Sequence, residues 1–454
     1  MRRLESKCEA RDRIDSAGEK RLAFLFEQTA GNFAMSDSPR DFLAELYEAA
    51  VAAADPKPAL AKALPESRER PAVVLGAGKG AAQLARAFEE LWTGPVRGIA
   101  VTRYGFGVPC EHVRVLEAAH PVPDENGIMA SRELMNLADS LGEKDFAVAL
   151  ITGGGSALLP MPPKGMTLDD EILLNEILLK SGAPISAMNA IRKQFSGIKG
   201  GRLAAAAWPV EMQTYIVSDV PGDDPAQVAS GPTVPDSAGP DAALAAIYRY
   251  AIDLPGKFLD RLSSENDSAP RPGAPEFKTS KAVIIASAEL SLMAALAKSR
   301  SLGTEAKILS VDLEGEAREA GRFLASVAKE VRKSNRPFEK PVAILSGGET
   351  TVTVKGSGQG GPNTETMLSF ALEIDGCDGI YAMSADTDGI DGMGSNAGAF
   401  ADGGTIERIR RQGLDPVECL AVNDSKMAMA AAGDLLETGP TGTNVNDFRA
   451  ILVV

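Results

Sequence analysis

The chain has 454 residues, of which 44% are hydrophobic and 24% charged, and its formal net charge is −15. This length exceeds one ordinary hydrophobic core, so two domains are expected. The excess of acidic residues argues against a nucleic-acid partner and against an anionic membrane surface. No apolar run in the sequence reaches the roughly 18 residues that span a bilayer, so no membrane-spanning segment is predicted.

The four cysteines and two histidines restrict the chemistry further. The cysteines have no paired spacing, so neither a disulfide framework nor a zinc site is indicated, and the cytoplasm is the predicted compartment. A multi-histidine metal site is excluded, and a Ser-His-Asp hydrolase would have to use His112 or His120. His120 stands in His120-Pro-Val-Pro-Asp124, a sequence more typical of a rigid turn than of a catalytic base.

The start of the chain is predicted to differ from the rest. Residues 1–34 are charged at their beginning and lack the apolar core of a signal peptide. We expect them to form an extension outside the compact fold, followed by a helix that begins near Ser36-Asp-Ser-Pro39. From Pro71 onward, short apolar strands alternate with helical segments, which is the pattern of an α/β fold with a parallel sheet. Residues 35–240 are therefore predicted to form a Rossmann-like first domain.

Two turn-rich stretches, residues 231–240 and 263–280, indicate a division between domains. We expect a hinge region over residues 241–279 and a smaller α/β domain over residues 280–454. Both sheets are expected to be mainly parallel. The last strand, at residues 450–454, could belong to either sheet.

The segments after the predicted strands are rich in glycine and polar residues. In open α/β sheets, ligands bind beyond the carboxyl ends of the strands. Glycines let the backbone approach a ligand closely, and the helix N-termini behind them supply amide donors to anionic oxygens. Together these segments predict a phosphate or carboxylate site; they are residues 76–80, 151–156, 217–224, 345–349 and 384–394.

Three carboxylates follow one predicted strand within six residues: Asp386, Asp388 and Asp391. Carboxylates this close would repel one another in a closed core and suit a hard cation such as Mg²⁺. An isolated Asp-rich loop is more often a solvated turn. The glycine-rich ends of the other strands favour the metal site here.

The loop Gly76-Ala-Gly-Lys-Gly-Ala81 has two interpretations. It satisfies the dinucleotide-binding fingerprint, although the next strand ends at Arg103 where an acidic residue is usual, which would favour NADP. Lys79 is unusual in that role and suits the neutralisation of charge on a transferring phosphoryl group. A lysine that merely starts a helix is the simplest alternative.

Two further segments carry polar groups that suit anions. Residues 188–202 contain four cations, among which Arg192 could hold a carboxylate in a planar fork. For any single one of these cations, a solvated helix face is the simpler interpretation. Residues 438–447 are a dense run of hydroxyls, amides and glycines that suits phosphate oxygens or metal ligands.

In combination, these motifs resemble a known family. Those that carry the resemblance are Gly76-Ala-Gly-Lys79, His120-Pro-Val-Pro-Asp124, Gly153-Gly-Gly-Ser-Ala-Leu158, Ile198-Lys-Gly-Gly-Arg-Leu203, Ser218-Asp-Val-Pro-Gly-Asp-Asp-Pro225, Ser230-Gly-Pro-Thr233, Thr387-Asp-Gly-Ile-Asp-Gly392, Asn423-Asp-Ser425 and residues 438–447. Residues 40–454 resemble the glycerate 2-kinase family with a C-terminal MOFRL domain, often called hydroxypyruvate reductases. The resemblance implies two α/β domains with the active site in the cleft between them. It also implies ATP and Mg²⁺ as cofactors, and D-glycerate as a substrate that is phosphorylated on its 2-hydroxyl.

The resemblance and the strand-end motifs together assign roles to individual residues. Lys79 and Asp219 are the predicted catalytic residues, with Asp219 orienting or deprotonating the hydroxyl. The substrate carboxylate is expected at Gly154, Gly155 and Ser156, with Arg192 nearby. The predicted nucleotide-binding residues are Gly78, Gly347, Gly348, Glu349, Asn363, Thr441 and Asn444. The predicted metal ligands are Asp219, Asp386, Asp388 and Asp391.

One departure from the family pattern concerns the substrate. The family commonly has Gly-Gly-Arg-Asn-x-Glu where this chain reads Gly360-Gly-Pro-Asn-Thr-Glu365, so Pro362 stands in place of an arginine expected to contact an anion. A kinase for another small hydroxy acid therefore stays open. The loop at residues 76–81 with Arg103 also leaves open an NAD(P)H-dependent hydroxypyruvate reductase, and the glycine-rich loops leave open a non-catalytic sensor of sugar phosphates. The sequence also leaves open whether the chain forms a homo-oligomer.

Overall fold

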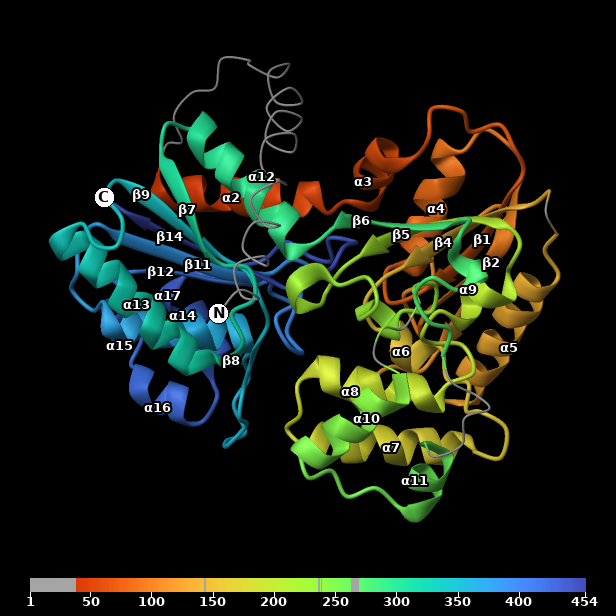
Figure 1. Ribbon diagram of the computed structural model, residues 1–454. Coiled ribbons are helices and arrows are strands. Elements are labelled where there is room, and N and C mark those ends of the chain that lie inside the picture. Colours follow the sequence, from red (N-terminus) through yellow and green to blue (C-terminus); the bar gives the residue numbers. More distant parts are fainter. Residues whose placement is uncertain (1–37, 143, 236, 238, 263–268) are drawn as a thin grey trace, which may run out of the picture.

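The computed structural model describes residues 38–142, 144–235, 237, 239–262 and 269–454. The predicted extension at residues 1–34 lies outside the described residues. Two halves, each built on a six-stranded sheet covered by helices, lie side by side in Figure 1. The predicted α/β fold is confirmed.

The first sheet is parallel and has the strand order β3-β2-β1-β4-β5-β6, which is the order of a Rossmann fold. Its inner strands β1 and β4 are buried at every residue, because helices cover both faces of a parallel sheet. The strands are β1 (Ala72–Ala77), β2 (Val96–Arg103), β3 (Val113–Ala118), β4 (Phe146–Ile151), β5 (Glu211–Val217) and β6 (Ser280–Ala286).

Helices cover the two faces of this sheet with separate apolar clusters. On one face, Leu60 and Phe88 pack against Val74, and on the other, Leu134 and Leu203 pack in the cluster around β1 and β4. The helices are α3 (Pro56–Ala63) and α4 (Ala81–Leu91) on the first face, and α5 (Glu125–Asp139), α6 (Gly155–Leu158) and α9 (Arg202–Ala206) on the second.

The second sheet is mixed, with the order β13-β12-β11-β14-β9-β7. The expectation of mainly parallel pairing is corrected here: β7 and β9 are parallel, but β9–β14, β14–β11, β11–β12 and β12–β13 are antiparallel. The last strand lies in this sheet, between β11 and β9. The strands are β7 (Glu305–Ser310), β9 (Val342–Ser346), β11 (Ile380–Asp386), β12 (Gly398–Asp402), β13 (Leu435–Leu436) and β14 (Asp447–Val453); β8 (Gly315–Glu316) and β10 (Thr350–Thr351) form a separate small parallel pair.

The chain passes between the two halves more often than the predicted division allows. β6, expected to open the second domain, pairs with β5 in the first sheet. Conversely, α2 (Pro39–Ala53) packs on the second sheet: Phe42 and Leu46 share an apolar cluster with Leu345 and Phe448. The local sequence cannot reveal these pairings, because they depend on partners about 65 to 400 residues away.

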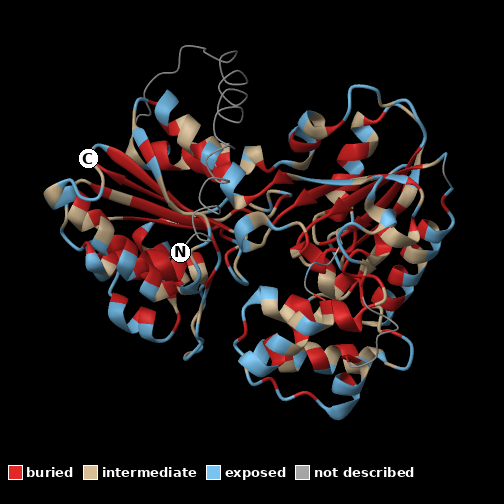
Figure 2. Ribbon diagram, in the orientation of Figure 1, coloured by how far each residue is buried: buried red, intermediate tan, exposed pale blue. Residues whose placement is uncertain are grey.

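The other helices of the second half cover both faces of its sheet (Figure 1). With α2, α12 (Ala288–Ser301) covers one face. The opposite face is covered by α13 (Ala317–Ser334), α14 (Pro362–Glu373), α15 (Thr405–Arg411), α16 (Pro416–Ala421) and α17 (Ser425–Ala432). Figure 2 shows the strands of both sheets buried between these layers.

A separate helical group lies below the first sheet in Figure 1. It consists of α7 (Leu168–Lys180), α8 (Ile185–Arg192), α10 (Gly239–Arg249) and α11 (Gly256–Leu262), which share their own apolar cluster around Leu178, Ile191 and Phe258. Much of the predicted hinge region is therefore helical and packs against α7 and α8. None of the helices in the described ranges is long and apolar enough to cross a bilayer.

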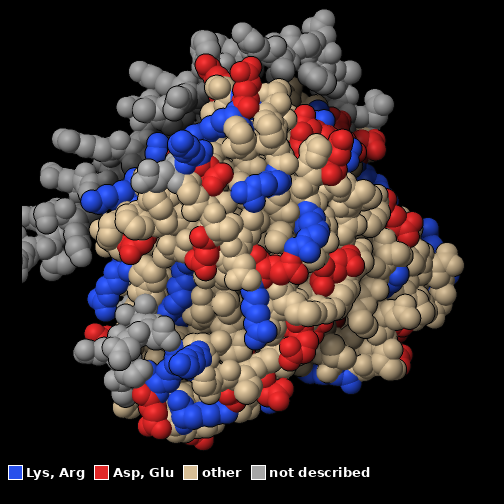
Figure 3. Space-filling model, turned by 90° about the vertical axis from the view of Figure 1, so that its right-hand side faces the viewer, with Lys and Arg blue, Asp and Glu red and all other residues tan. Residues whose placement is uncertain are grey.

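The surface charge is mixed on the face shown in Figure 3, where lysines and arginines are interspersed with aspartates and glutamates. The net charge of −15 therefore says little about the potential at any one place on this face. Recognition of a charged ligand therefore depends on the individual side chains that line its binding site.

A buried ion pair lies in the second sheet, where Arg449 and Asp447 of β14 have 1% and 3% of their side chains exposed. Arg449 also donates to the carbonyl of Gly347 at 3.0 Å and to Oγ1 of Thr350 at 3.0 Å. Asp447 accepts the backbone amide of Thr350 at 3.1 Å. This pair fixes the loop after β9 against β14.

We predict that Arg449→Met destabilises the protein by about 3–5 kcal/mol, because the Asp447 carboxylate would be left buried without its cation. Urea unfolding of the variant measures the loss. The control is Arg410→Met, which removes an ion pair with Asp375 at 2.9 Å whose arginine side chain is 57% exposed. Exposed pairs contribute little, so equal losses in the two variants would contradict the prediction.

Candidate functional site

A cavity of ≈ 270 Å³ lies between the two halves of the protein. One side is formed by segments at the carboxyl ends of β1, β2, β4 and β5, and the other by the turn after β11 and the loop before β14. Its polar lining includes Lys79, Arg103, Thr152, Asp219, Asp388 and Asn444. The cavity is at the place where a parallel sheet of this topology binds ligands.

Lys79 is held by its backbone between two strand ends. Its amide donates to the carbonyl of Gly153 at 2.8 Å, and its carbonyl accepts Oγ1 of Thr102 at 2.9 Å. The next amide, that of Gly80, donates to Oγ1 of Thr152 at 2.9 Å. The glycine loop after β1 is therefore fixed to both neighbouring strands, which directs the Lys79 side chain into the cavity.

Gly153 and Gly154 allow Lys79 and Asp219 to lie close to the β4 loop. A Cβ atom at Gly153 would lie 1.7 Å from Oδ2 of Asp219, so the carboxylate packs directly on that backbone. Gly154 has φ of 78°, and a Cβ there would lie 2.8 Å from Cγ of Lys79 and 3.1 Å from Nε2 of His120. Burial raises the pKa of Asp219, and the Lys79 cation opposes this rise.

The turn after β11 presents Asp388 to the cavity. Oδ1 of Asp388 accepts the amide of Ile390 at 2.8 Å, and Asn444 Nδ2 donates to its Oδ2 at 3.5 Å. Thr441 supports the turn from behind, donating its amide to the carbonyl of Asp388 at 3.0 Å. Burial is the main cause that raises the pKa of Asp388, whereas Lys79 and Arg103 lower it.

Asp386 lies at the end of β11 and does not line the cavity. Its Oδ1 accepts the backbone amide of Asp388 at 2.9 Å. Burial and then the carboxylates of Asp388 and Asp447 raise its pKa well above the usual range. Asp386 thus supports Asp388 from outside the cavity lining.

Two predicted site residues, Asp391 and Asn363, lie away from the cavity at the N-terminus of α14. Asp391 accepts the amide of Asn363 at 2.8 Å and both the amide and hydroxyl of Thr364, at 2.9 and 2.8 Å. Burial raises the pKa of Asp391 to about 6. Asn363 is 1% exposed and donates to Asp447 at 2.7 Å. Contrary to expectation, both side chains are engaged in holding α14 against the second sheet.

The loop after β9 lies near the other side of Asp219. Gly348 and Asp219 line a second cavity of ≈ 70 Å³ beside the first. The carbonyl of Gly347 accepts the amide of Leu313 at 3.1 Å, so it is part of the loop framework. Glu349 is exposed, and Gly78 packs against Thr152, which lines the main cavity.

The residues predicted to bind the substrate carboxylate do not lie together at the main cavity. Gly154 and Gly155 start the short α6, and Gly154 lies beside Lys79. Ser156 and Arg192 do not line the main cavity. Oγ of Ser156 lies 2.7 Å from Oγ of Ser230, and Arg192 donates to the side chains of Asn175 at 2.8 Å and Asn189 at 3.2 Å.

The family resemblance implies Mg²⁺, and the carboxylates around the cavity are the side chains that could hold it. Within the described residues, no group of three or more His, Cys, Asp or Glu side chains is placed to hold a metal ion. A protein cage is not required, however, because Mg²⁺ is usually held by one or two carboxylates together with substrate phosphates. Asp219 and Asp388 both line the main cavity and fit that requirement.

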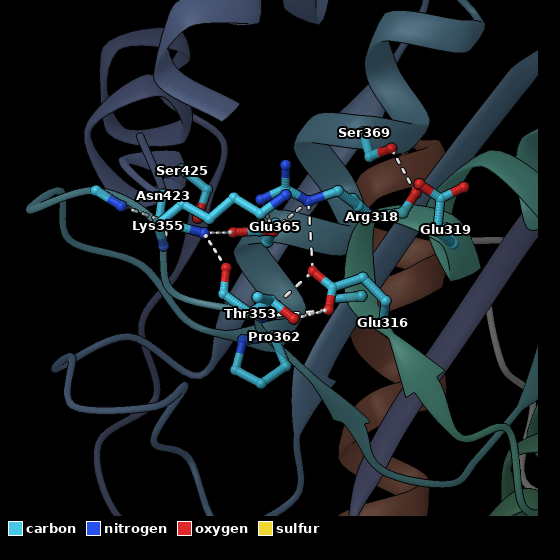
Figure 4. Close-up of polar contacts among 12 residues, drawn as sticks. Glu316, Arg318, Glu319, Thr353, Lys355, Pro362, Glu365, Ser369, Asn423 and Ser425 are labelled. Atoms are coloured by element: carbon cyan, nitrogen blue, oxygen red, sulfur yellow. Dashed lines mark hydrogen bonds and ion pairs between the residues drawn. The ribbon is translucent and has the colours of Figure 1, made fainter. Parts of the chain in front are cut away.

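Pro362 takes the first position of α14, where the missing amide hydrogen and the fixed φ of proline are tolerated. Figure 4 shows the polar cluster behind it. Glu365, which is 1% exposed, accepts Nε and Nη2 of Arg318 at 2.9 and 2.6 Å and Nδ2 of Asn423 at 3.1 Å. The cluster thus uses its polar groups to join α13, α14 and the start of α17.

Sequence reasoning gave little weight to three residues near the cavity. Arg103 and Gln83 line it, and His120 lies beside Gly154. Burial and the cations Lys79 and Arg103 lower the pKa of His120 to about 4, so it is neutral at pH 7. The position of Arg103 at the carboxyl end of a strand is a signal recognised from the sequence, but there it favours NADP and not a substrate acid. No such signal marks Gln83, which lies on an ordinary amphipathic helix.

Comparisons with known proteins fit this architecture. Residues 42–263 match a domain described as of unknown function, DUF4147, and residues 342–447 match the MOFRL family. The chain is 47% identical to an Agrobacterium vitis protein provisionally named hydroxypyruvate reductase, covering 92% of this chain and 95% of that protein.

Two comparisons involve Thermotoga maritima. D-glycerate 2-kinase of that organism is 38% identical, covering 92% of this chain and 99% of its own. The crystal structure of a glycerate kinase from T. maritima superposes with a TM-score of 0.82 and 37% identity, covering 91% of this chain and 99% of that one. The protein therefore belongs to the glycerate kinase family, as its sequence motifs predicted.

Proposed function

We propose that the protein is an ATP-dependent kinase that phosphorylates D-glycerate on its 2-hydroxyl to give 2-phosphoglycerate. The observation that carries the proposal is that Lys79, Asp219 and Asp388 line one cavity. A cation and two carboxylates around one cavity suit phosphoryl transfer, which depends on positioning and on stabilising charge. The identity of 38% to a protein named D-glycerate 2-kinase supports the same reaction.

In this mechanism Lys79 stabilises negative charge on the oxygens of the transferring phosphoryl group. Asp219 orients the acceptor hydroxyl and takes its proton. Asp219 and Asp388 would hold Mg²⁺ together with the substrate phosphates, and the cation would neutralise part of the phosphate charge.

The central test is incubation with ATP, Mg²⁺ and D-glycerate, with separate coupled detection of 2-phosphoglycerate and 3-phosphoglycerate. We expect the 2-phosphate as the product. Formation of the 3-phosphate alone would contradict the assignment of the hydroxyl. Oxidation of NADPH with hydroxypyruvate, without any phosphorylated product, would instead support the reductase function suggested by the name of the A. vitis relative.

We predict that Lys79→Met lowers kcat by at least about 10²-fold, the scale of losing one oxyanion-stabilising donor. The thermal midpoint should change little, because the backbone contacts of residue 79 remain. Lys62→Met is the matched control, since Lys62 is an exposed lysine of α3. A Lys79→Met enzyme with wild-type kcat would remove this side chain from the mechanism.

A second prediction separates the two neighbouring aspartates. Asp388→Ala should reduce turnover with little loss of stability, because Asp388 lines the cavity. Asp391→Ala should destabilise the protein by about 1–3 kcal/mol, because the amides of Asn363 and Thr364 would lose their buried acceptor. Kinetics and urea unfolding of both variants provide the check. Loss of turnover in folded Asp391→Ala, with normal turnover in Asp388→Ala, would reverse the assignment.

A further inference from the structure

The first-sheet side of the main cavity contains a polar wall around Phe106. Gln83 of α4 and Arg103 at the end of β2 both line the cavity there. Nε2 of Gln83 donates to the carbonyl of Phe106 at 3.3 Å. The guanidinium of Arg103 lies over the Phe106 ring, with Cζ 3.4 Å from the ring centroid. Both side chains are thus fixed by one loop.

Each of these side chains has a buried polar atom without a hydrogen-bond partner among the residues that the structure describes: Oε1 of Gln83 and Nε of Arg103. The orientation of the Gln83 amide is determined, because its nitrogen is needed as the donor to the Phe106 carbonyl. The wall therefore holds one acceptor and one cationic donor that no other described residue satisfies. A buried polar atom without a partner is unfavourable, and a ligand with complementary groups would satisfy both atoms.

The charges around the cavity narrow the choice of ligand. Arg103 makes no ion pair within the described residues. Burial lowers the pKa of its guanidinium, and the negative charge of Asp388, which lines the same cavity, opposes that shift. Arg192, expected to hold the substrate carboxylate, is already engaged with Asn175 and Asn189. Arg103 is therefore the arginine that is placed to receive an anionic group in this cavity. Its planar fork matches a carboxylate.

We infer that Arg103 and Gln83 form the subsite for the hydroxy acid. Arg103 binds the carboxylate, and Oε1 of Gln83 accepts a hydrogen bond from the hydroxyl that is not phosphorylated. This inference rests on the proposed kinase function and gives it a substrate class: small acids that carry a second hydroxyl. In this arrangement Lys79 and the glycine loop after β1 bind the phosphoryl group.

The test of Arg103 is steady-state kinetics with D-glycerate and ATP varied separately. Arg103→Met should raise KM for D-glycerate at least about tenfold, while KM for ATP stays within about twofold of the wild type. Arg103→Lys should give an intermediate KM, because it keeps the charge and loses the fork. The control is Arg97→Met, an exposed arginine at the opposite end of the same strand. A rise in KM for ATP instead would overturn the inference and assign Arg103 to the nucleotide phosphates.

The test of Gln83 uses D-lactate, which has the carboxylate and 2-hydroxyl but lacks the second hydroxyl. Gln83→Leu should raise KM for D-glycerate about tenfold or more, because a site built for a hydroxyl discriminates strongly. The inhibition constant of D-lactate should stay unchanged. Equal weakening of both acids, or weakening of ATP alone, would overturn the role of Gln83.

Failure of the proposed function can be distinguished from failure of this subsite. If the wild-type enzyme phosphorylates no D-glycerate, the kinase proposal fails. Calorimetric titration of D-glycerate without ATP then tests the subsite alone in the wild type, Arg103→Lys and Arg97→Met. Binding that Arg97→Met retains and Arg103→Lys weakens would support the subsite. Absence of binding to the wild type, or equal binding to all three proteins, would overturn it.

Discussion

The hydrogen bond from Nδ2 of Asn446 to the backbone carbonyl of Asp219, at 3.0 Å, joins the two halves of the candidate site. Asp219 follows the first sheet and Asn446 precedes the last strand of the second. A further bond, from Oγ1 of Thr443 to the carbonyl of Ala54 at 2.7 Å, attaches the same loop to the segment between α2 and α3. The cavity exists because this loop is held across the gap, so its shape depends on contacts between segments far apart in sequence.

The loop before β14 owes its position to the buried pair of Asp447 and Arg449 immediately after it. Asp447 accepts hydrogen bonds from Thr350, after β9, and from Asn363, in α14. One carboxylate therefore relates three elements of the second half to the strand that leads out of the site. Burial of such a charge is tolerable because the Arg449 cation and several donors satisfy it. The functional loop is thus anchored in the interior of the protein, a few residues from the cavity.

The sequence was informative for candidate site residues that lie next to a strand end. Lys79, Asp219 and Asp388 follow apolar strands directly, so the general rule for α/β sheets was enough to place them at the cavity. The rule could not distinguish Asp388 from Asp391, three residues apart, because the path of the turn decides which carboxylate faces the cavity and which accepts the amides of α14. Arg103 and Arg192 illustrate the same limit: the neighbours that occupy an arginine come from other elements.

The fold shows a corresponding division between local and long-range information. The alternation of strands and helices predicted the first sheet, whose strands β1 to β5 follow one another with crossovers. In the second sheet, β14 enters between β11 and β9 and runs antiparallel to both. Hydrophobic pattern alone does not fix strand direction in a sheet that is buried on both faces, because parallel and antiparallel strands then have similar apolar runs. Pairing across more than 60 residues decided these features.

The charge distribution across the cavity implies which ligands it can accept together. Lys79 and Arg103 stand on the first-sheet side, whereas Asp388 faces them from the second. A bare phosphate group bound by Lys79 would meet repulsion from Asp388. An anion accompanied by a divalent cation would not, because the cation can lie between the phosphates and the carboxylate. The charges around the cavity therefore favour a phosphate group accompanied by a divalent cation over a phosphate group alone.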